Sequence, residues 1–268
     1  MKKVLALTAL LCCIISGVAF SACGDSGTVP IDEISIVAPS STSIRAGETF
    51  TLGYTTVPEE AAESIKVNWE ISDSRRLSYK NGEFTALTCG TVKVTARVKG
   101  NEAYDEIELK VIAPAGFNSY SGNGYSLVYP SNWSASTVGT VRSWSAATGF
   151  PNMNVVTEML NPSYMTASAS TFQSTYESTY TLMGFTVNFT QPVTVEKSKY
   201  LGVERVKVTS AYSLYSSGTT TNIRQIQLIF NNSDKNLSCV LTLTFKEIYY
   251  GNSAVQLQDT IFSQFMPA

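Results

Sequence analysis

Few residues of this chain could carry out catalysis. The 268-residue sequence contains no His, and His is both the commonest general base and the commonest metal ligand in proteins. Serines are abundant, but a Ser nucleophile needs a base within reach, and no Ser-x-x-Lys motif occurs after residue 22. Paired carboxylates could hydrolyse glycosides, yet the sequence indicates no pairing among Glu158, Glu177, Glu196, Glu204 and Glu247. We therefore predict no catalytic residue and a protein that is not an enzyme.

Metal, cofactor and nucleic-acid sites are not predicted either. A zinc site needs clustered Cys or His, but Cys89 and Cys239 lie far apart in the sequence, and we expect two separate thiols rather than a disulfide. The GNG stretch at 122–124 is a turn before a strand and not a phosphate-binding loop. A formal net charge of -2 gives no electrostatic basis for binding nucleic acid. A weak calcium site made of Asp and carbonyl oxygens stays an open alternative.

Four tyrosines are the best candidates for ligand recognition. Tyr212 and Tyr215 precede the small polar stretch SSGTTT, which we expect at the tip of a hairpin, and Tyr249 and Tyr250 precede Gly251. Tyrosines exposed among small polar residues make good contacts with proteins or sugars. The alternative is that these rings merely cover the sheet. We predict that the four tyrosines bind a protein or another ligand of the cell envelope.

The start of the chain has the three parts of an export signal. Two lysines are followed by an apolar run that is short for a membrane span, and then by FSAC, which ends at Cys23. This ending resembles the lipobox of bacterial lipoproteins, although Phe20 replaces the usual Leu. The resemblance implies a signal peptide over 1–22, a tether over 23–29, and lipid on Cys23 that anchors the protein to the extracytoplasmic face of a bacterial membrane. An ordinary secretory signal or an uncleaved anchor is the alternative.

Residues 30–113 have the pattern of short strands separated by turns. Apolar and polar residues alternate in at least five runs, which is typical of half-buried strands, and Asn81-Gly82 is a strong hairpin signal. The stretches RAGETFTLGYTTVPEEA, VNWEISD and NGEFTALTCGTVKVTARV resemble the bacterial Ig-like group 2 family. This resemblance implies an all-β Ig-like sandwich with Trp69 in its core. Such domains serve as spacers or adhesive modules on cell surfaces.

Residues 116–268 mix strands with helices. Apolar residues at helical spacing predict a helix over 168–183, with Ser168 as its N-cap and Gly184 at its end, and a second helix over 252–265. Between the helices the apolar period is two, interrupted at Pro192. The sequence NGYSLVYPSNW resembles the opening of PsbP-like domains. That family includes extrinsic photosystem subunits, and the resemblance implies an α+β domain, built as an α-β-α sandwich with an antiparallel sheet. The metal contacts of some members are not expected here, because the chain has no His.

The sequence therefore predicts a mixed fold class, with the Ig-like sandwich followed by the PsbP-like domain. For its function we expect a non-enzymatic surface lipoprotein without a cofactor. The first module would act as a stalk that presents the second to a protein or other envelope ligand. One alternative is an enzyme, or a subunit of one, that uses carboxylates or a weakly bound divalent cation. Another is a purely structural protein in which both modules are spacers.

Overall fold

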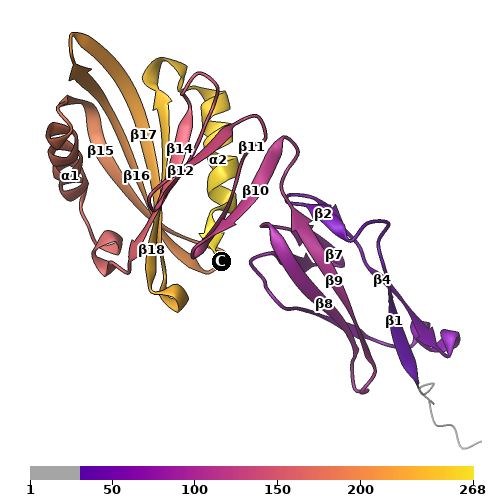
Figure 1. Cartoon of the computed structure of the whole chain (residues 1–268). Helices are drawn as coiled ribbons and strands as arrows, with labels where there is room; N and C mark the ends of the chain where they lie inside the picture. Colours follow the sequence, from indigo (N-terminus) through magenta and orange to yellow (C-terminus); the bar gives the residue numbers. More distant parts are fainter. Residues whose placement is uncertain (1–30) are drawn as a thin grey trace, which may run out of the picture.

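The computed structural model describes residues 31–268, so that Cys23, the predicted signal peptide and the predicted tether lie outside the described residues. Strands hold 55% of the described chain and helices 18%. Within residues 31–268 no helix is long and apolar enough to cross a membrane. Figure 1 shows two strand-rich regions that follow one another along the chain and meet near the start of β10 (Phe117–Gly122).

The first region, residues 31–113, consists of three small sheets. Its elements are β1 (Glu33–Val37), β2 (Ser43–Arg45), β3 (Thr49–Phe50), β4 (Gly53–Val57), the 3-10 helix η1 (Glu59–Glu63), β5 (Val67–Ile71), β6 (Leu77–Lys80), β7 (Glu83–Ala86), β8 (Gly90–Val98) and β9 (Tyr104–Ile112). The strand orders are β1-β4, β3-β7-β6 and β2-β9-β8-β5. In the largest sheet β2 runs parallel to β9, whereas β8 pairs antiparallel with both of its neighbours.

Local signals and a shared core explain the first region. Asn81 and Gly82 take positive φ angles of 54° and 87°, as a tight turn between β6 and β7 requires. The β3-β7-β6 sheet packs on the largest sheet through buried side chains such as Phe84 and Leu109. Trp69 is half-buried, and its ring meets that of Phe84 edge-on with 5.4 Å between the centroids. Two layers of sheet therefore enclose one apolar core.

The second region, residues 116–268, is built on one large sheet. Its strands are β10, β11 (Tyr125–Pro130), β12 (Ser134–Val138), β13 (Val141–Ser145), β14 (Asn152–Met159), β15 (Thr186–Tyr200), β16 (Val203–Ser216), β17 (Thr219–Asn232), β18 (Leu237–Lys246) and β19 (Met266–Pro267). Its helices are η2 (Pro162–Met165), α1 (Ala169–Leu182), η3 (Ser233–Lys235), η4 (Glu247–Tyr249) and α2 (Asn252–Gln264). Seven antiparallel strands form the order β12-β13-β14-β18-β17-β16-β15, and β10-β11-β19 form a separate sheet.

The positions of the two α-helices confirm the helical periodicity of the sequence. The Ser168 hydroxyl accepts a hydrogen bond from the Thr171 N–H at 3.2 Å, which caps α1, and Gly184 follows the helix with a φ of +84°. Pro192 lies in β15 where the pairing with β16 shifts register between Gln191 and Thr194. A bulge accommodates the missing N–H of the proline there.

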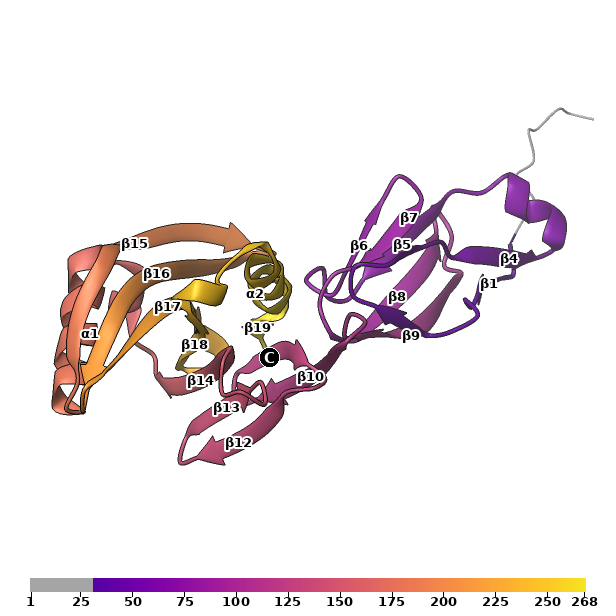
Figure 2. The ribbon, with the colours of Figure 1, turned by 90° about the horizontal axis from the view of Figure 1, so that it is seen from above.

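The two faces of the seven-stranded sheet are covered differently. On one face α2 and the small sheet bury a large core, which includes Trp144, Leu241 and Phe265. On the other face α1 packs through Phe172 and Tyr176 on residues of β15, β16 and β17. Figure 2 shows α1 and α2 on opposite sides of the sheet.

The predicted fold class is wrong. The described chain is mostly β, with five separate sheets, and it is not an α-β-α sandwich. The layer beside α2 is mixed, because β10, β11 and β19 form a sheet of their own next to that helix. The sequence showed where helices begin and end, but not that the strands at 117–130 leave the main sheet and pair with the end of the chain.

Gln264 joins the two regions. Its carboxamide Nε2 donates to the Leu87 carbonyl at 2.6 Å, and its Oε1 accepts from the Cys89 N–H at 3.0 Å. The side chain of Arg76 in turn donates to the Cys89 carbonyl. Because Gln264 is 5% exposed, water competes little for these bonds, and they fix the end of α2 against the first region.

Candidate binding surfaces

The four predicted tyrosines differ in exposure. Tyr212 is 0% exposed. Its hydroxyl donates to Gln225 Oε1 at 2.5 Å and lies 2.8 Å from the hydroxyl of Tyr180. Burial raises the pKa of Tyr212. The prediction that Tyr212 contacts a ligand at the surface is therefore wrong, because its ring is buried beneath α1.

Tyr250 is also used within the fold. It is half-buried, its hydroxyl donates to the Gln258 side chain at 2.8 Å, and its ring meets that of Phe245 edge-on at 5.3 Å between centroids. By contrast, Tyr215 is 49% exposed and Tyr249 is 72% exposed. Two of the four tyrosines are thus accessible to a partner.

The end of the large sheet furthest from the first region carries a group of exposed apolar and tyrosine side chains. We name this the distal group, and its members are 38% to 89% exposed: Leu182, Met183, Tyr215, Ile248, Tyr249 and Val255. Pairing of Thr186 with Tyr215 and of Ile223 with Lys246 brings the end of α1, the β16–β17 hairpin and η4 to this one end. In Figure 1 it lies at the top of the molecule, opposite the first region.

An ion pair holds part of the distal group in place. Arg224 of β17 donates from Nε to Glu247 Oε2 at 2.9 Å and from Nη2 to Glu247 Oε1 at 2.6 Å. The hydrogen bond to this carboxylate raises the pKa of Arg224. The guanidinium also lies over the Tyr250 ring, 5.1 Å from its centroid. This bidentate pair fixes η4, which carries Ile248 and Tyr249, to the sheet.

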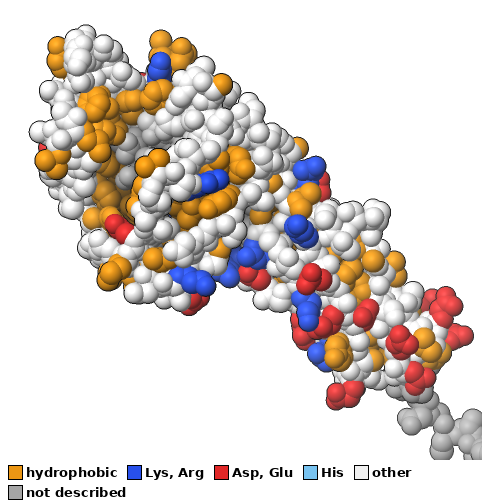
Figure 3. Space-filling model, in the orientation of Figure 1, with side chains coloured by type: hydrophobic (Ala, Val, Ile, Leu, Met, Phe, Trp, Pro, Cys, Tyr) orange, Lys and Arg blue, Asp and Glu red, His pale blue; other side chains and the backbone are white. Residues whose placement is uncertain are grey.

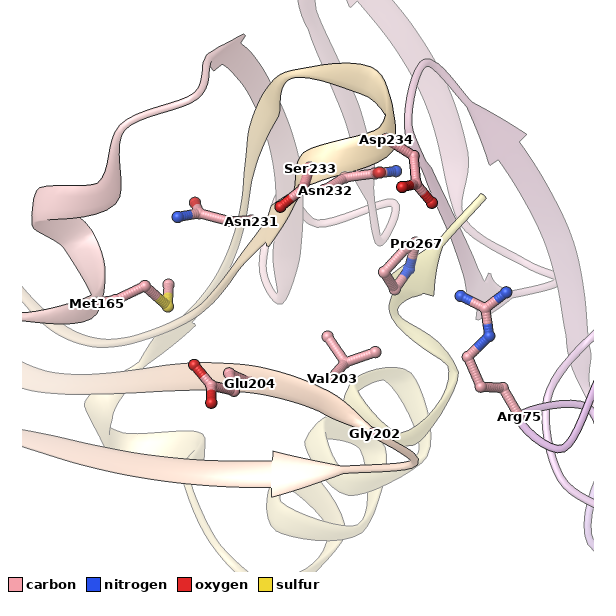
Figure 4. A pocket seen from close by; sticks show the side chains of 10 residues that line it. All are labelled: Arg75, Met165, Gly202, Val203, Glu204, Asn231, Asn232, Ser233, Asp234 and Pro267. Carbon is pink, nitrogen blue, oxygen red and sulfur yellow. The ribbon is translucent and has the colours of Figure 1, made fainter.

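A cleft at the opposite end of the sheet is the second candidate. Figure 4 shows this cleft of about 400 Å³, which is lined by Arg75, Met165, Gly202, Val203, Glu204, Asn231, Asn232, Ser233, Asp234 and Pro267. Much of its polar lining serves the fold. Arg75 pairs with Asp73 at 3.0 Å, and the Asn232 carboxamide donates to the Gly124 carbonyl at 2.8 Å.

The two carboxylates that line the cleft lie on different sides of it. Glu204 lies beside Met165 in Figure 4, while Asp234 lies on the other side near Arg75. Among residues 31–268 no group of three or more His, Cys, Asp or Glu could hold a metal ion. Sequence reasoning missed this cleft, because its lining comes from five separate segments. The polar stretch NNSDKN at 231–236, which contributes four of the lining residues, is typical of a turn and gives no sign of a cleft.

The two described cysteines are separate thiols, as predicted. Burial raises the pKa of Cys239 to about 12. Burial also raises the pKa of Cys89 to about 11, against the opposing charge of Arg76. Both side chains therefore stay protonated near neutral pH and are poor nucleophiles.

Comparisons with known proteins give likenesses of fold only. No family model and no curated protein sequence matches the chain. The solution structure of cyanobacterial PsbP (CyanoP) from Synechocystis is similar with a TM-score of 0.44 and 16% identity, over 58% of this chain and 94% of that one. A crystal structure from Bacteroides thetaiotaomicron has a TM-score of 0.36 and 13% identity, over 56% of this chain and 48% of that one. The yeast Ran-binding protein Mog1p has a TM-score of 0.36 and 10% identity, over 56% of this chain and 94% of that one.

One of these neighbours is thus a PsbP structure, and all three TM-scores are below 0.5. Nothing among them matches the Ig-like and lipoprotein resemblances, which stay predictions.

Proposed function

We propose that this protein is a non-enzymatic lipoprotein of the cell envelope, whose distal group binds another protein. Residues 30–113 act as a stalk, and lipid on Cys23 holds the stalk to the extracytoplasmic face of a membrane. The observation that carries the proposal is the distal group itself, six exposed side chains that lie on both sides of the sheet at the end of the second region that points away from the stalk.

The chemistry of the distal group favours a protein partner. Large exposed apolar side chains gathered in one area mark interaction sites on soluble proteins, and tyrosines are common among the residues that dominate binding energy. The hairpin beside Tyr215 contributes small hydroxyl side chains over 216–221, which suits the polar rim of an interface. Burial of the apolar members contributes about 25 cal/mol for each Å² removed from water.

Site-specific cross-linking tests the proposed partner site. A photo-reactive phenylalanine analogue would replace Tyr249 or Tyr215 in the cells that make the protein. Tyr104, which is 55% exposed in the first region, is the matched control. We expect one discrete cross-linked protein from Tyr249 and Tyr215, none from Tyr104, and loss of the product when Ile248 and Leu182 are both changed to Ser. Equal products from all three positions, or none from the distal two, would contradict the proposal.

The anchor is tested independently. Radiolabelled palmitate should enter the wild-type protein and be absent from a Cys23→Ser variant. Each buried methylene of an acyl chain contributes about 0.8 kcal/mol to membrane binding, so the variant should also lose its stable membrane association. Label that enters both proteins equally would remove the lipid anchor from the proposal without affecting the distal group.

A further inference from the structure

Half of one face of the large sheet has no helix over it. On the side of α1, the cluster beneath that helix takes in side chains of β15, β16 and β17 and reaches Val240 of β18, while the rest of β18 and β14, β13 and β12 continue the same face beyond it. Paired residues in an antiparallel sheet point to the same side. The pairing scheme therefore identifies the side chains that occupy this open half.

The open half presents two adjacent rows of uncharged hydrogen-bonding side chains. We name these eight residues the polar face; one row is Ser134, Ser145, Asn152 and Thr244, and the next is Ser136, Ser143, Asn154 and Thr242. Every member is a hydroxyl or a carboxamide, and each row crosses four strands. Neighbouring strands lie about 4.8 Å apart, so one row extends over roughly 14 Å. In Figure 3 this side of the molecule is hollowed beside α1.

Most of the polar face is not used by the fold. Asn152 donates to the Gly149 carbonyl at 2.8 Å, and Thr242 accepts from the Gln227 side chain at 3.1 Å. The other six side chains form no side-chain hydrogen bond with another residue of 31–268. By comparison, the neighbouring Gln225 and Gln227 accept hydrogen bonds from Tyr180 and Tyr176 of α1, each within 3.2 Å. The covered half has satisfied its polar groups, whereas the open half keeps its donors and acceptors available.

Apolar side chains border the polar face. Val138 pairs with Val141, and Val156 pairs with Val240, in the next row of the same face. The pairing of Arg142 with Val155 places Val141 opposite Val156, so this row is continuous. Beyond the row that contains Asn152 and Thr244, the centroid of the Phe150 ring lies 5.7 Å from the Lys246 ammonium.

We propose that the polar face binds a neutral oligosaccharide. A sugar chain offers hydroxyl groups at its edges and apolar C–H surfaces on its rings, and the open half offers the same combination in parallel rows. None of the eight residues is charged, so the two rows offer neutral donors and acceptors to a ligand; the charges of this side, Lys246 and Glu158, lie outside the rows. The site is distinct from the distal group and does not depend on the proposed protein partner.

Calorimetric titration of the full chain tests this proposal. The protein would be purified in a detergent without a sugar head group and titrated with three neutral sugars, chitohexaose, cellohexaose and maltohexaose, and with the acidic pentagalacturonate for comparison. The triple variant Ser143→Ala, Asn154→Ala, Thr244→Val removes three hydrogen-bonding groups from adjacent strands. Thr157→Ala is the matched control, since Thr157 lies on β14 but pairs with the buried Cys239 on the opposite face. Melting curves of both variants check that the fold is kept.

We expect at least one of the three sugars to bind, at least tenfold weaker binding by the triple variant, and unchanged binding by Thr157→Ala. The sugar that binds best distinguishes an acetylated wall-type glycan from a plain glucan. Three outcomes would overturn the proposal: no heat with any neutral sugar, equal binding by the triple variant, or binding of pentagalacturonate alone. Self-association of the wild type that is lost in the triple variant would assign the face to a second copy instead.

Discussion

The two regions differ most in how they treat charge. Residues 31–113 contain 13 acidic and 9 basic side chains, whereas the much longer second region, 116–268, contains 7 acidic and 8 basic ones. Figure 3 shows the red and blue side chains concentrated over the first region. Its exposed strands carry ion pairs, such as Lys93 with Glu106 at 2.8 Å and Arg97 with Glu70 at 3.4 Å.

The surface of the second region is different in kind. Its polar face consists of hydroxyls and carboxamides, and its distal group consists of apolar and tyrosine side chains. Charged strands keep a sheet soluble and discourage edge or face association. A partner can cover neutral hydrogen-bonding or apolar surfaces at a lower desolvation cost than charged surfaces. The difference favours a solubilising, supporting role for the first region and a binding role for the second.

The largest effect should come from a substitution that destabilises the core of the first region and leaves the core of the second intact. Phe84 is 0% exposed in the core of the first region, and Phe84→Ala should lower its free energy of unfolding by about 3–5 kcal/mol. Because the cores are separate clusters, calorimetry should show the first-region transition fall while that of the second region stays nearly unchanged. A single transition that shifts as a whole would mean that the regions unfold as one unit.

A smaller effect should follow from breaking the joint between the regions. Gln264→Ala leaves the Leu87 carbonyl and the Cys89 N–H without their partner, which should cost about 1–3 kcal/mol. We expect small-angle scattering to show a broader range of distances between the regions. The control Gln256→Ala changes a glutamine on the exposed side of the same helix. A scattering profile identical to that of the wild type would show that other contacts set the geometry.

Two ion pairs allow a direct comparison of the regions. Arg224→Gln breaks a pair whose side chains are 14% and 32% exposed, whereas Lys93→Gln breaks one whose side chains are 52% and 39% exposed. Chemical denaturation should give a loss of about 1–2 kcal/mol for the first variant and a smaller loss for the second, because water and salt screen an exposed ion pair. Arg224→Gln should also reduce cross-linking from Tyr249, since η4 loses its attachment. Equal losses for the two variants would argue that η4 is held by other contacts.

The smallest effect is expected from pH, and acid should act on the first region. Burial alone would raise the pKa of Asp73, but the hydrogen bonds and the charge of Arg75 outweigh burial, so the net shift of this pKa is downward. The hydrogen bond from Lys93 lowers the pKa of Glu106. Such carboxyls stabilise the fold at a pH above their pKa in the unfolded state. This stabilisation is lost as the pH falls through their pKa in the folded state. The first-region melting temperature should therefore begin to drop below about pH 4.5.

Base should act on buried thiols and phenols. Burial raises the pKa of Cys239 and of Tyr164 to about 12 in the second region, and that of Cys89 to about 11 in the first. These groups stabilise the fold below their unfolded pKa values, and the contribution is lost as the pH rises above 9.0 for Cys and 10.0 for Tyr. A second-region melting temperature that rises between pH 9 and 11 would contradict this sign.

Local signals were predictable because each depends on neighbours in the chain. The sequence determined the extent of both helices, the cap at Ser168, the turn at Asn81-Gly82 and the irregularity at Pro192, which the structure accommodates as a bulge within one strand. Side-chain spacing, a cap hydroxyl or a missing N–H acts within a few residues, so the amino-acid order alone specifies it. Alternation also identified β18 as a strand and the MNVVTEML segment as most of β14, whereas β12 and β13, the other two strands of the polar face, were not predicted.

Only the tertiary structure decided which of these features meet. Tyr212 and Tyr215 share one strand, yet the first is buried under α1 and the second is exposed at a hairpin. The rows of the polar face exist because β14 pairs with β18, which follows it after three intervening strands. Strand order and helix placement depend on which distant apolar surfaces bury one another. Strand order therefore depends on the whole chain, because the free energy of burial comes from contacts between residues that are far apart in the sequence.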